Sequence, residues 1–202
     1  MMHLPSKVEV VIIGGGIVGT STAYYLAKMG ISVALCEKGL IGGEQSSRNW
    51  GFVRQQGRDP AEIPLIIRSM QIWKDLSNEI DEDIGFKQSG TLYLANTENQ
   101  LSNYEAWLEH AKQYQIDTKI LSRSEIEDKL PNATGKWIGA LTTPSDGRAE
   151  PTMVTGAISR AAERLGAFIL KGCAVRGVER SGGNVSGVVT EHGSIQTNAV
   201  LC

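Results

Sequence analysis

Three glycines and one acidic residue near the N-terminus have the types and spacing that phosphate binding requires. Gly14, Gly16 and Gly19 form a Gly-x-Gly-x-x-Gly turn directly after an apolar run, and Glu37 follows the last glycine by 18 residues. In such a turn the first glycine makes the bend, the second lets the backbone approach a pyrophosphate, and the third lets helix pack on strand. The pyrophosphate lies against the N–H groups that begin the helix. A carboxylate at this distance is typical of one that binds a ribose, so these four residues predict a dinucleotide site.

The segments around this turn have the order that such a site needs. Residues 8–13 are β-branched and almost continuously apolar, which is typical of a strand buried on both faces of a parallel sheet. From Ile17 apolar residues recur at helical spacing until Gly30 ends the helix. Residues 31–36 are a second strand, and Glu37 stands at its end. This βαβ unit makes the glycine pattern specific, although the motif alone does not separate NAD from FAD.

The stretch that follows is a loop, where an NAD-binding domain would place a helix. Residues 39–54 are rich in glycine, serine and amide side chains and have almost no periodicity, and no second mononucleotide-binding half is apparent. Such a loop offers N–H groups, hydroxyls and a guanidinium to a flat, polar, electron-accepting ring, and it therefore favours a flavin. The alternative for residues 46–49 is an ordinary solvated loop that caps the next helix.

At this loop the sequence resembles the FAD-dependent amino-acid and amine oxidoreductases, the family of D-amino-acid oxidase, glycine oxidase and sarcosine oxidase. The resemblance is carried by the GGGIVG turn at 14–19, by the acid that ends the second strand, and by the segment SSRNWGFVR at 46–54. It implies an α/β fold, with a Rossmann-like FAD-binding domain and part of an inserted α+β substrate domain. The FAD-binding domain would comprise residues 1–85 and a truncated second part, 148–202, and the partial substrate domain residues 86–147. The resemblance covers essentially all of these residues but only the first half of a typical member.

The resemblance also implies which residues contact the FAD. In family members the serine-rich segment lies along the isoalloxazine, and a strand residue that Val175 resembles meets the adenine through its backbone. The expected cofactor-binding residues are Gly14, Gly16, Ile17, Val18, Gly19, Glu37, Lys38, Gln45, Ser46, Ser47, Arg48, Asn49, Gly51 and Val175. Arg48 and Arg54 each have three interpretations, as a contact of the flavin, as a contact of a substrate carboxylate, or as a surface charge. No catalytic residue is assigned, and no metal site is expected.

The activity that the resemblance implies is oxidation of the C–N bond of an amino acid or a secondary amine to an imine. The flavin carries the redox chemistry, and the protein positions and tunes it. Two alternatives stay open: a flavin dehydrogenase subunit that passes electrons to a partner chain, and a non-catalytic nucleotide-binding fragment. Since most substrate-binding residues of the family lie in its second half, we expect residues 1–202 alone to be inactive. The substrate is a small amine or amino acid that the sequence does not identify, and a partner subunit or a second copy of the chain is a further possible partner.

Composition and charge exclude several other classes of protein. The 20 basic and 22 acidic residues give a net charge of −2, with no basic patch for nucleic acid or an anionic membrane. The three cysteines form no CxxC pair and no even framework, which indicates a reducing compartment. The apolar run 8–18 is shorter than the ~20 residues of a membrane span, and the N-terminus lacks the pattern of a signal peptide. The sequence therefore predicts a soluble, cytoplasmic flavoprotein.

The rest of the chain alternates between helical and strand patterns. An amphipathic helix is expected at 63–80, a helix capped by Thr97, a short helix with a capping box of Ser122 and Glu125, and a helix that starts at Pro151. Strands are expected at residues 91–95, 137–141, 168–170, 174–178, 185–190 and 199–202, with a hairpin turn at 182–183.

Overall fold

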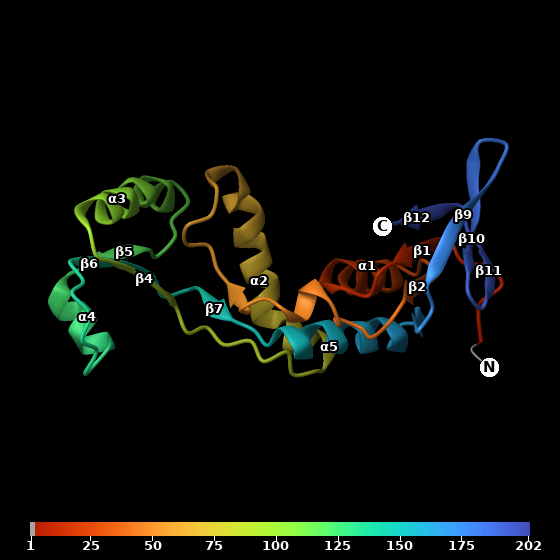
Figure 1. The fold of residues 1–202 in the computed structure, drawn as a ribbon, viewed down its shortest axis with the longest axis horizontal. Helices are drawn as coiled ribbons and strands as arrows, with labels where there is room; N and C mark the ends of the chain where they lie inside the picture. The colour runs from red at the N-terminus through yellow and green to blue at the C-terminus, as the bar shows by residue number, and fades with distance from the viewer. Residues whose placement is uncertain (1–2) are drawn as a thin grey trace. The chain divides into compact units, whose positions relative to one another are not determined.

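The computed structural model describes residues 3–202, and its fold is shown in Figure 1. The contacts between residues divide the chain into two units. The first unit contains the residues up to Trp50 together with Asn78–Ile84 and Glu150–Cys202. The second unit contains Gly51–Ser77 and Gly85–Ala149.

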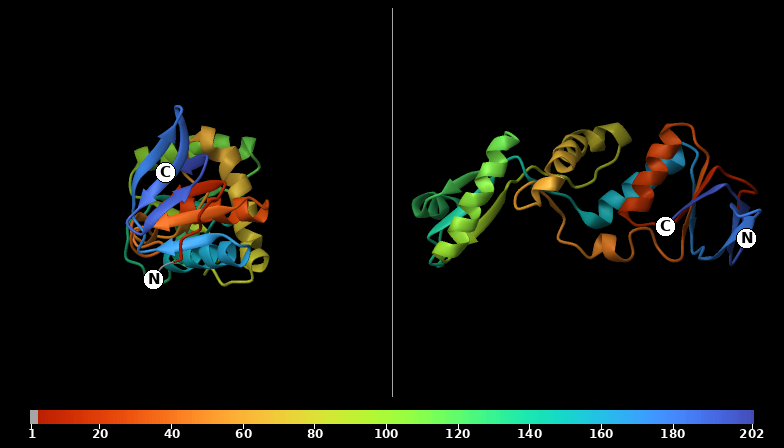
Figure 2. Two further views of the ribbon diagram at one scale, coloured as in Figure 1. Left: turned by 90° about the vertical axis from the view of Figure 1, so that its right-hand side faces the viewer. Right: turned by 90° about the horizontal axis from the view of Figure 1, so that it is seen from above.

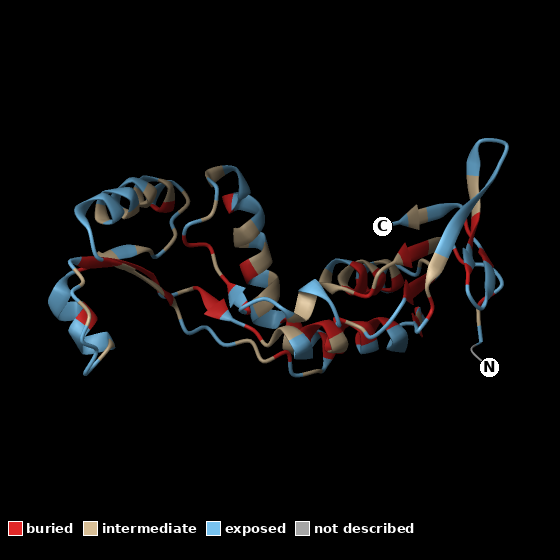
Figure 3. Cartoon of the chain, viewed as in Figure 1, coloured by how far each residue is buried: buried red, intermediate tan, exposed pale blue. Residues whose placement is uncertain are grey.

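The first unit is built on a parallel sheet of four strands in the order β12-β1-β2-β8. The strands are β1 (Val10–Ile13), β2 (Val33–Glu37), β8 (Phe168–Lys171) and β12 (Ala199–Leu201). Every residue of β2 is buried, as expected for a central strand of a parallel sheet. Helices α1 (Ile17–Lys28) and α5 (Pro151–Arg164) pack against each other. Figure 3 shows buried residues along β1 and β2 and on one side of α5. The predicted α/β class, with a parallel sheet, is confirmed.

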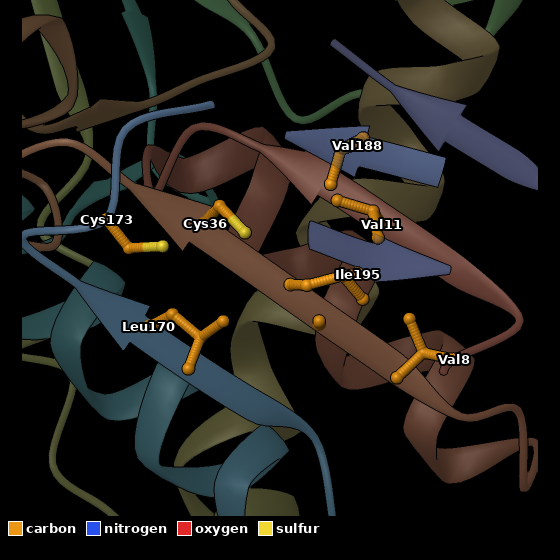
Figure 4. Packing of buried hydrophobic residues seen from close by; sticks show 8 residues of the cluster. Val8, Val11, Cys36, Leu170, Cys173, Val188 and Ile195 are labelled. Atoms are coloured by element: carbon orange, nitrogen blue, oxygen red, sulfur yellow. The ribbon is translucent and has the colours of Figure 1, made fainter. Parts of the chain in front are cut away.

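An antiparallel meander completes the first unit. It consists of β9 (Val175–Ser181), β10 (Asn184–Thr190) and β11 (Gly193–Gln196), and both views in Figure 2 show it, in blue, close to the parallel sheet. The hairpin turn has positive φ at Gly182 and Gly183, a conformation that glycine adopts without strain. Buried side chains of both sheets form one apolar cluster, drawn in Figure 4, to which Val11, Leu170, Val188 and Ile195 belong.

The second unit contains two small antiparallel sheets. One has the order β4-β6-β5, with β4 (Thr91–Ala95), β5 (Lys119–Leu121) and β6 (Gly139–Thr143), and the other pairs β3 (Phe52–Val53) with β7 (Gly147–Arg148). Helices α3 (Glu98–Gln113) and α4 (Arg123–Lys129) contact the larger sheet. Helix α2 (Ile63–Ile80) lies in this unit up to Ser77, and its last three residues belong to the first unit.

The helix ends of the structure agree with the predicted caps. Thr97 accepts the N–H of Gln100 at the start of α3, Ser122 and Glu125 form a complete capping box on α4, and Pro151 is the first residue of α5. Helix α2 has the predicted bounds. These features depend on residues close in sequence, which is why a local pattern reveals them.

The structure differs from the expectations in three respects. Strands β3, β5, β7 and β11 were not expected, and β6 begins two residues later than the predicted strand at 137–141. Residues 51–77 group with the middle of the chain, whereas the sequence placed them with the first FAD-binding segment. Their grouping follows from the pairing of β3 with β7, which joins segments almost a hundred residues apart. No helix in residues 3–202 is long and apolar enough to cross a membrane.

Candidate functional site

The glycine turn after β1 is held by contacts that only glycine permits. Gly14 has a φ of +111°, and its N–H donates to the carbonyl of Cys36 at 2.9 Å. A Cβ on Gly19 would lie 2.0 Å from the carbonyl oxygen of Gly14, so a side chain there would force the helix away from the turn. The fold itself therefore requires both glycines, whatever ligand the turn binds.

The start of α1 presents N–H groups to a ligand. The first N–H groups of a helix lack carbonyl partners inside it, and here these belong to Ile17, Val18 and Gly19. The hydroxyl of Ser46 accepts the Ile17 N–H at 2.8 Å. Within residues 3–202, no acceptor is found for the N–H groups of Val18 and Gly19. A Cβ on Gly16 would meet only the Ser46 hydroxyl, at 2.9 Å. With no acidic residue in its first turn, this positive helix end fits a phosphate group.

Glu37 lies beside this turn, at the end of β2. Its carboxylate accepts the N–H of Gly15 through Oε2 and the N–H of Gly39 through Oε1, both at 2.7 Å, and the residue is only 8% exposed. The Cys173 N–H donates to its backbone carbonyl at 2.8 Å. An ionised carboxylate has about four acceptor positions, so this one can still accept hydroxyl donors. The arrangement fits a ribose bound next to the phosphates.

The loop after β2 folds back onto the turn. The Gly42 N–H donates to the carbonyl of Gly15 at 2.8 Å, and Gln45–Ser47 form one 3-10 turn. The amide of Asn49 donates to the Ser46 carbonyl at 2.7 Å, and the Ser47 hydroxyl donates to the Glu44 carbonyl at 3.1 Å. The loop thus places the hydroxyl of Ser46 at the start of α1 and leaves the side chain of Gln45 exposed.

The charged residues of this loop form exposed ion pairs. Lys38 lies 3.5 Å and Arg48 3.2 Å from the carboxylate of Glu44, and all three side chains are more than half exposed. Exposed ion pairs of this kind contribute at most about 1 kcal/mol to the free energy of unfolding. The charge of Arg48 is therefore balanced locally, which weakens its interpretation as a contact of a substrate carboxylate.

Two further expected residues, Val175 and Gly51, do not belong to this cluster. Val175 is partly buried at the start of β9, where it pairs with Thr190 and packs against the apolar cluster shared by the two sheets. Gly51 belongs to the second unit, where it has a φ of +71° and its carbonyl accepts the Ala149 N–H at 2.9 Å. The remaining expected residues, those around the turn and the loop, are brought together in the first unit.

Two buried thiols lie close to Glu37 in the sequence or through its backbone. Cys36 precedes Glu37 on β2, Cys173 follows β8, and both side chains belong to the apolar cluster of Figure 4. Burial, and next the nearby Cys173 thiol, raise the pKa of Cys36 to about 12. The Cys36 thiol is therefore neutral, and both buried side chains serve as packing groups.

A second polar cluster, which the sequence analysis missed, lies in the second unit around Arg54. The guanidinium donates to the carbonyl of Gln56 and lies 5.8 Å from the ring centroid of Tyr93. Within the part of the chain that the structure describes, no acidic side chain forms an ion pair with Arg54. Arg54, Arg58 and Ser69 line a small cavity of about 100 Å³, together with Trp73. Trp73 also stacks on Phe86 and packs, partly buried, against the apolar cluster of Val53, Met70 and Ala149.

The chain is similar to known flavoproteins along almost its whole length. The model of the family described as "FAD dependent oxidoreductase" matches residues 9–202. Mitochondrial sarcosine dehydrogenase of Mus musculus is 33% identical, over 98% of this chain and 22% of that protein. Sarcosine oxidase subunit beta of an Arthrobacter species is 32% identical, over 95% of this chain and 49% of that protein. The chain thus spans between about a fifth and a half of the length of these relatives.

Solved structures give the same result for the fold. L-Amino acid deaminase from Proteus myxofaciens superimposes with a TM-score of 0.94 at 34% identity, over 99% of this chain and 46% of that chain. L-Proline dehydrogenase from P. horikoshii superimposes with a TM-score of 0.91 at 34% identity, over 98% of this chain and 52% of that chain.

Proposed function

The chain belongs to the family of FAD-dependent oxidoreductases, and from this premise we propose that its protein oxidises the C–N bond of an amino acid or secondary amine. The imine that forms is then hydrolysed by water. The names of the similar proteins support this class of substrate, because they include enzymes of sarcosine, glycine and L-amino acids. When bound, FAD supplies the acceptor for the hydride equivalent.

In this proposal the residues of the first unit bind the dinucleotide. The N–H groups at the start of α1 hold the pyrophosphate, and Gly16 leaves room for its approach. Glu37 accepts the hydroxyls of the adenosine ribose, and the segment that contains Val175 lies against the adenine. The loop from Gln45 to Asn49 contacts the flavin end. The observation that carries this assignment is the juxtaposition of the Glu37 carboxylate with the glycine turn, through the Gly15 N–H.

Arg54 is the residue that we assign to the substrate. A substrate carboxylate needs a cation whose charge is not already neutralised, and Arg54 has no acidic partner among the described residues, whereas Arg48 is paired with Glu44. A guanidinium can hold a carboxylate with two parallel hydrogen bonds. Bound in this way, an amino acid would be oriented by its carboxylate, and its amine would be left free to react.

The experiment that tests this function uses the full-length protein with its flavin. Sarcosine, glycine, L-proline and D-alanine are added separately under anaerobic conditions, and the loss of flavin absorbance is followed. We expect at least one of them to reduce the flavin, with release of the aldehyde or keto acid that imine hydrolysis produces. Bound flavin that none of these nor a wider set of amines reduces would contradict the proposal.

A second candidate is a subunit that passes electrons to a partner chain. Two observations favour it: several similar proteins are named as subunit beta of sarcosine oxidase, and others are named as dehydrogenases. Turnover with oxygen and release of hydrogen peroxide would indicate an oxidase. Turnover with an artificial dye but not with oxygen would indicate electron transfer to a partner.

The compartment remains part of the proposal. We place the protein in the cytoplasm because Cys36, Cys173 and Cys202 are all free thiols, as is usual in a reducing environment.

A further inference from the structure

Asp146 is a fully buried carboxylate that the proposed chemistry does not yet use. Its exposed fraction is 0%, and its two oxygens accept four hydrogen bonds. Oδ1 accepts the N–H of Gln55 at 2.7 Å and the side-chain amide of Gln55 at 3.4 Å. Oδ2 accepts the hydroxyl of Thr91 at 2.7 Å and the N–H of Gln56 at 3.2 Å. A buried carboxylate is costly unless such donors surround it, so this network specifies the local structure.

The backbone of Asp146 is itself fixed to the larger sheet of the second unit. Its N–H donates to the carbonyl of Thr143 at 3.2 Å, and its carbonyl accepts the N–H of Gly90 at 2.8 Å. Thr143 ends β6, and Gly90 directly precedes β4. The carboxylate is therefore a rigid anchor, and residues 55–56 are attached to it through their two N–H groups.

Asp146 is connected to Arg54 through one residue, Gln56. The carbonyl of Gln56 accepts a hydrogen bond from the Arg54 guanidinium, and the N–H of the same residue is held by Asp146. Gln56 is also held through its side chain, because its Oε1 accepts the hydroxyl of Thr143 at 2.9 Å. Gln56, whose carbonyl orients the guanidinium, thus has two separate attachments to the sheet. Asp146 provides the attachment to the backbone.

We propose that Asp146 is a positioning residue that fixes the backbone of Gln56 through its N–H, so that the Gln56 carbonyl holds the Arg54 guanidinium ready for a substrate carboxylate. The role of Arg54 in this inference rests on the proposed function. The hydrogen bonds between Asp146 and residues 55–56 are independent of that function. Asp146 does not touch the substrate in this scheme. By holding residues 55–56 in place, Asp146 lets Arg54 bind a carboxylate without a rearrangement of its own loop.

The test compares variants of the full-length, flavin-loaded protein. Asp146→Ala removes the anchor, Asp146→Asn keeps its shape with one acceptor oxygen, and Thr91→Val removes one of the four hydrogen bonds. Asp75→Asn is the matched control, because Asp75 is an exposed carboxylate on α2 in the same unit. Each protein is assayed with sarcosine and titrated calorimetrically with methoxyacetate, an unreactive carboxylate of the same shape. Each is also digested briefly with trypsin, which cleaves after arginine.

The expected result is a split between binding and turnover. Asp146→Ala should raise the KM for sarcosine and the Kd for methoxyacetate by about tenfold or more, the effect of losing one well-oriented charged hydrogen bond. The kcat should change by less than about threefold, since the reacting centre is untouched. Asp146→Asn and Thr91→Val should shift the same constants less, and Asp75→Asn should not shift them. Trypsin should cleave Asp146→Ala after Arg54 and spare the wild type there, because Gln55 and Gln56 are buried.

Two results would overturn the proposal. One is a folded Asp146→Ala protein with wild-type KM, Kd and tryptic pattern. The other is a loss of kcat and flavin content with KM unchanged, which would indicate a general structural role. If Asp146→Ala does not fold, Asp146→Asn and Thr91→Val decide the question by the same criteria. A wild-type protein that oxidises no amine and binds no carboxylate contradicts the proposed function instead, and the tryptic comparison then decides the anchoring role.

Discussion

The carboxylate of Glu37 accepts the N–H of Gly15 at 2.7 Å, which joins the end of β2 to the glycine turn that follows β1. The two residues are 22 positions apart, and adjacent parallel strands bring them together because both segments leave the same edge of the sheet. In the proposed function, this contact sets where the ribose and the pyrophosphate of FAD lie relative to each other.

We predict that Glu37→Gln lowers the affinity for FAD. The substitution removes a charged acceptor, and a hydrogen bond to a charged group contributes roughly 1.5–3 kcal/mol. The affinity should therefore fall about ten- to a hundredfold. Titration of the apoprotein of the full-length enzyme with FAD measures the change, and unchanged affinity would show that the acid has been assigned the wrong role.

Two glycines of the turn should respond differently to a side chain. Gly16→Val should fold but purify without colour, because its Cβ meets only the Ser46 hydroxyl and then occupies the path of the pyrophosphate. Gly19→Ala should fail to fold, because its Cβ would overlap the Gly14 carbonyl. Gly156→Ala on α5 is the control: its Cβ meets only the flexible end of Arg160, so it should keep both stability and flavin. Circular dichroism and flavin content separate these outcomes, and a yellow Gly16→Val protein would count against the phosphate site.

Acid should remove one stabilising interaction in the first unit. Hydrogen bonds from Arg160 and Arg164, each at 2.7 Å, lower the pKa of Glu82 from 4.5 to about 2. A carboxylate whose pKa is lower in the folded state stabilises the fold above its unfolded pKa, and this contribution is lost as the pH falls toward the folded pKa.

Glu82→Gln should therefore lower the urea midpoint at neutral pH, and its difference from wild type should shrink between about pH 4.5 and pH 2. Glu163→Gln, at an exposed position on α5, should match wild type throughout. A difference for Glu82→Gln that is independent of pH would mean that the ion pairs do not stabilise the fold.

The three cysteines should differ in reactivity. The pKa of Cys36 is raised to about 12 by burial and by Cys173, which is itself buried, whereas Cys202 is exposed. Iodoacetamide at about pH 8, close to the pKa of a free thiol, should modify Cys202 first. Modification of all three should require urea. Mass spectrometry of the alkylated peptides gives the answer, and rapid labelling of Cys36 in the folded protein would contradict its placement in the core.

Residues 1–202 expressed alone should bind FAD weakly and catalyse nothing. The chain spans only 22% of mouse sarcosine dehydrogenase and 49% of the Arthrobacter sarcosine oxidase subunit beta, so about half or more of each relative has no counterpart in these residues. Within the described residues, β12 pairs on one side only, with β1, so its other edge is open to a further segment. Flavin content and dye reduction by amines test this directly. Tight binding with turnover would show that the site is complete in these residues.

Local sequence patterns were sufficient to predict the βαβ unit that carries the glycine turn and Glu37. The strand, glycine turn, helix and acid lie within the first 37 residues, and each has a residue-level signature: β-branched runs, Gly14 for the bend, and Glu37 at the strand end. The helix caps at Thr97 and Ser122 were found for the same reason. Such features depend on neighbours a few positions apart.

The polar cluster around Arg54 could not be found in this way. Asp146 stands in a segment that reads as an ordinary turn, and its partner Gln55 is 91 residues away. The residues around Asp146 and Gln55 show no helical or strand periodicity of apolar side chains. The nearby strands β3 and β7 have only two residues each, which is too short for an alternating pattern. Burial of a carboxylate becomes visible only when the donors that satisfy it are brought together by the fold.

The most direct test is the visible spectrum of the purified full-length protein, recorded before and after anaerobic addition of sarcosine and related amines. We predict flavin absorbance in the isolated protein and its loss when a substrate amine is added, with the corresponding imine hydrolysis product in solution. A colourless protein that cannot be reconstituted with FAD, or a flavin that no amine or amino acid reduces, would contradict the proposed function.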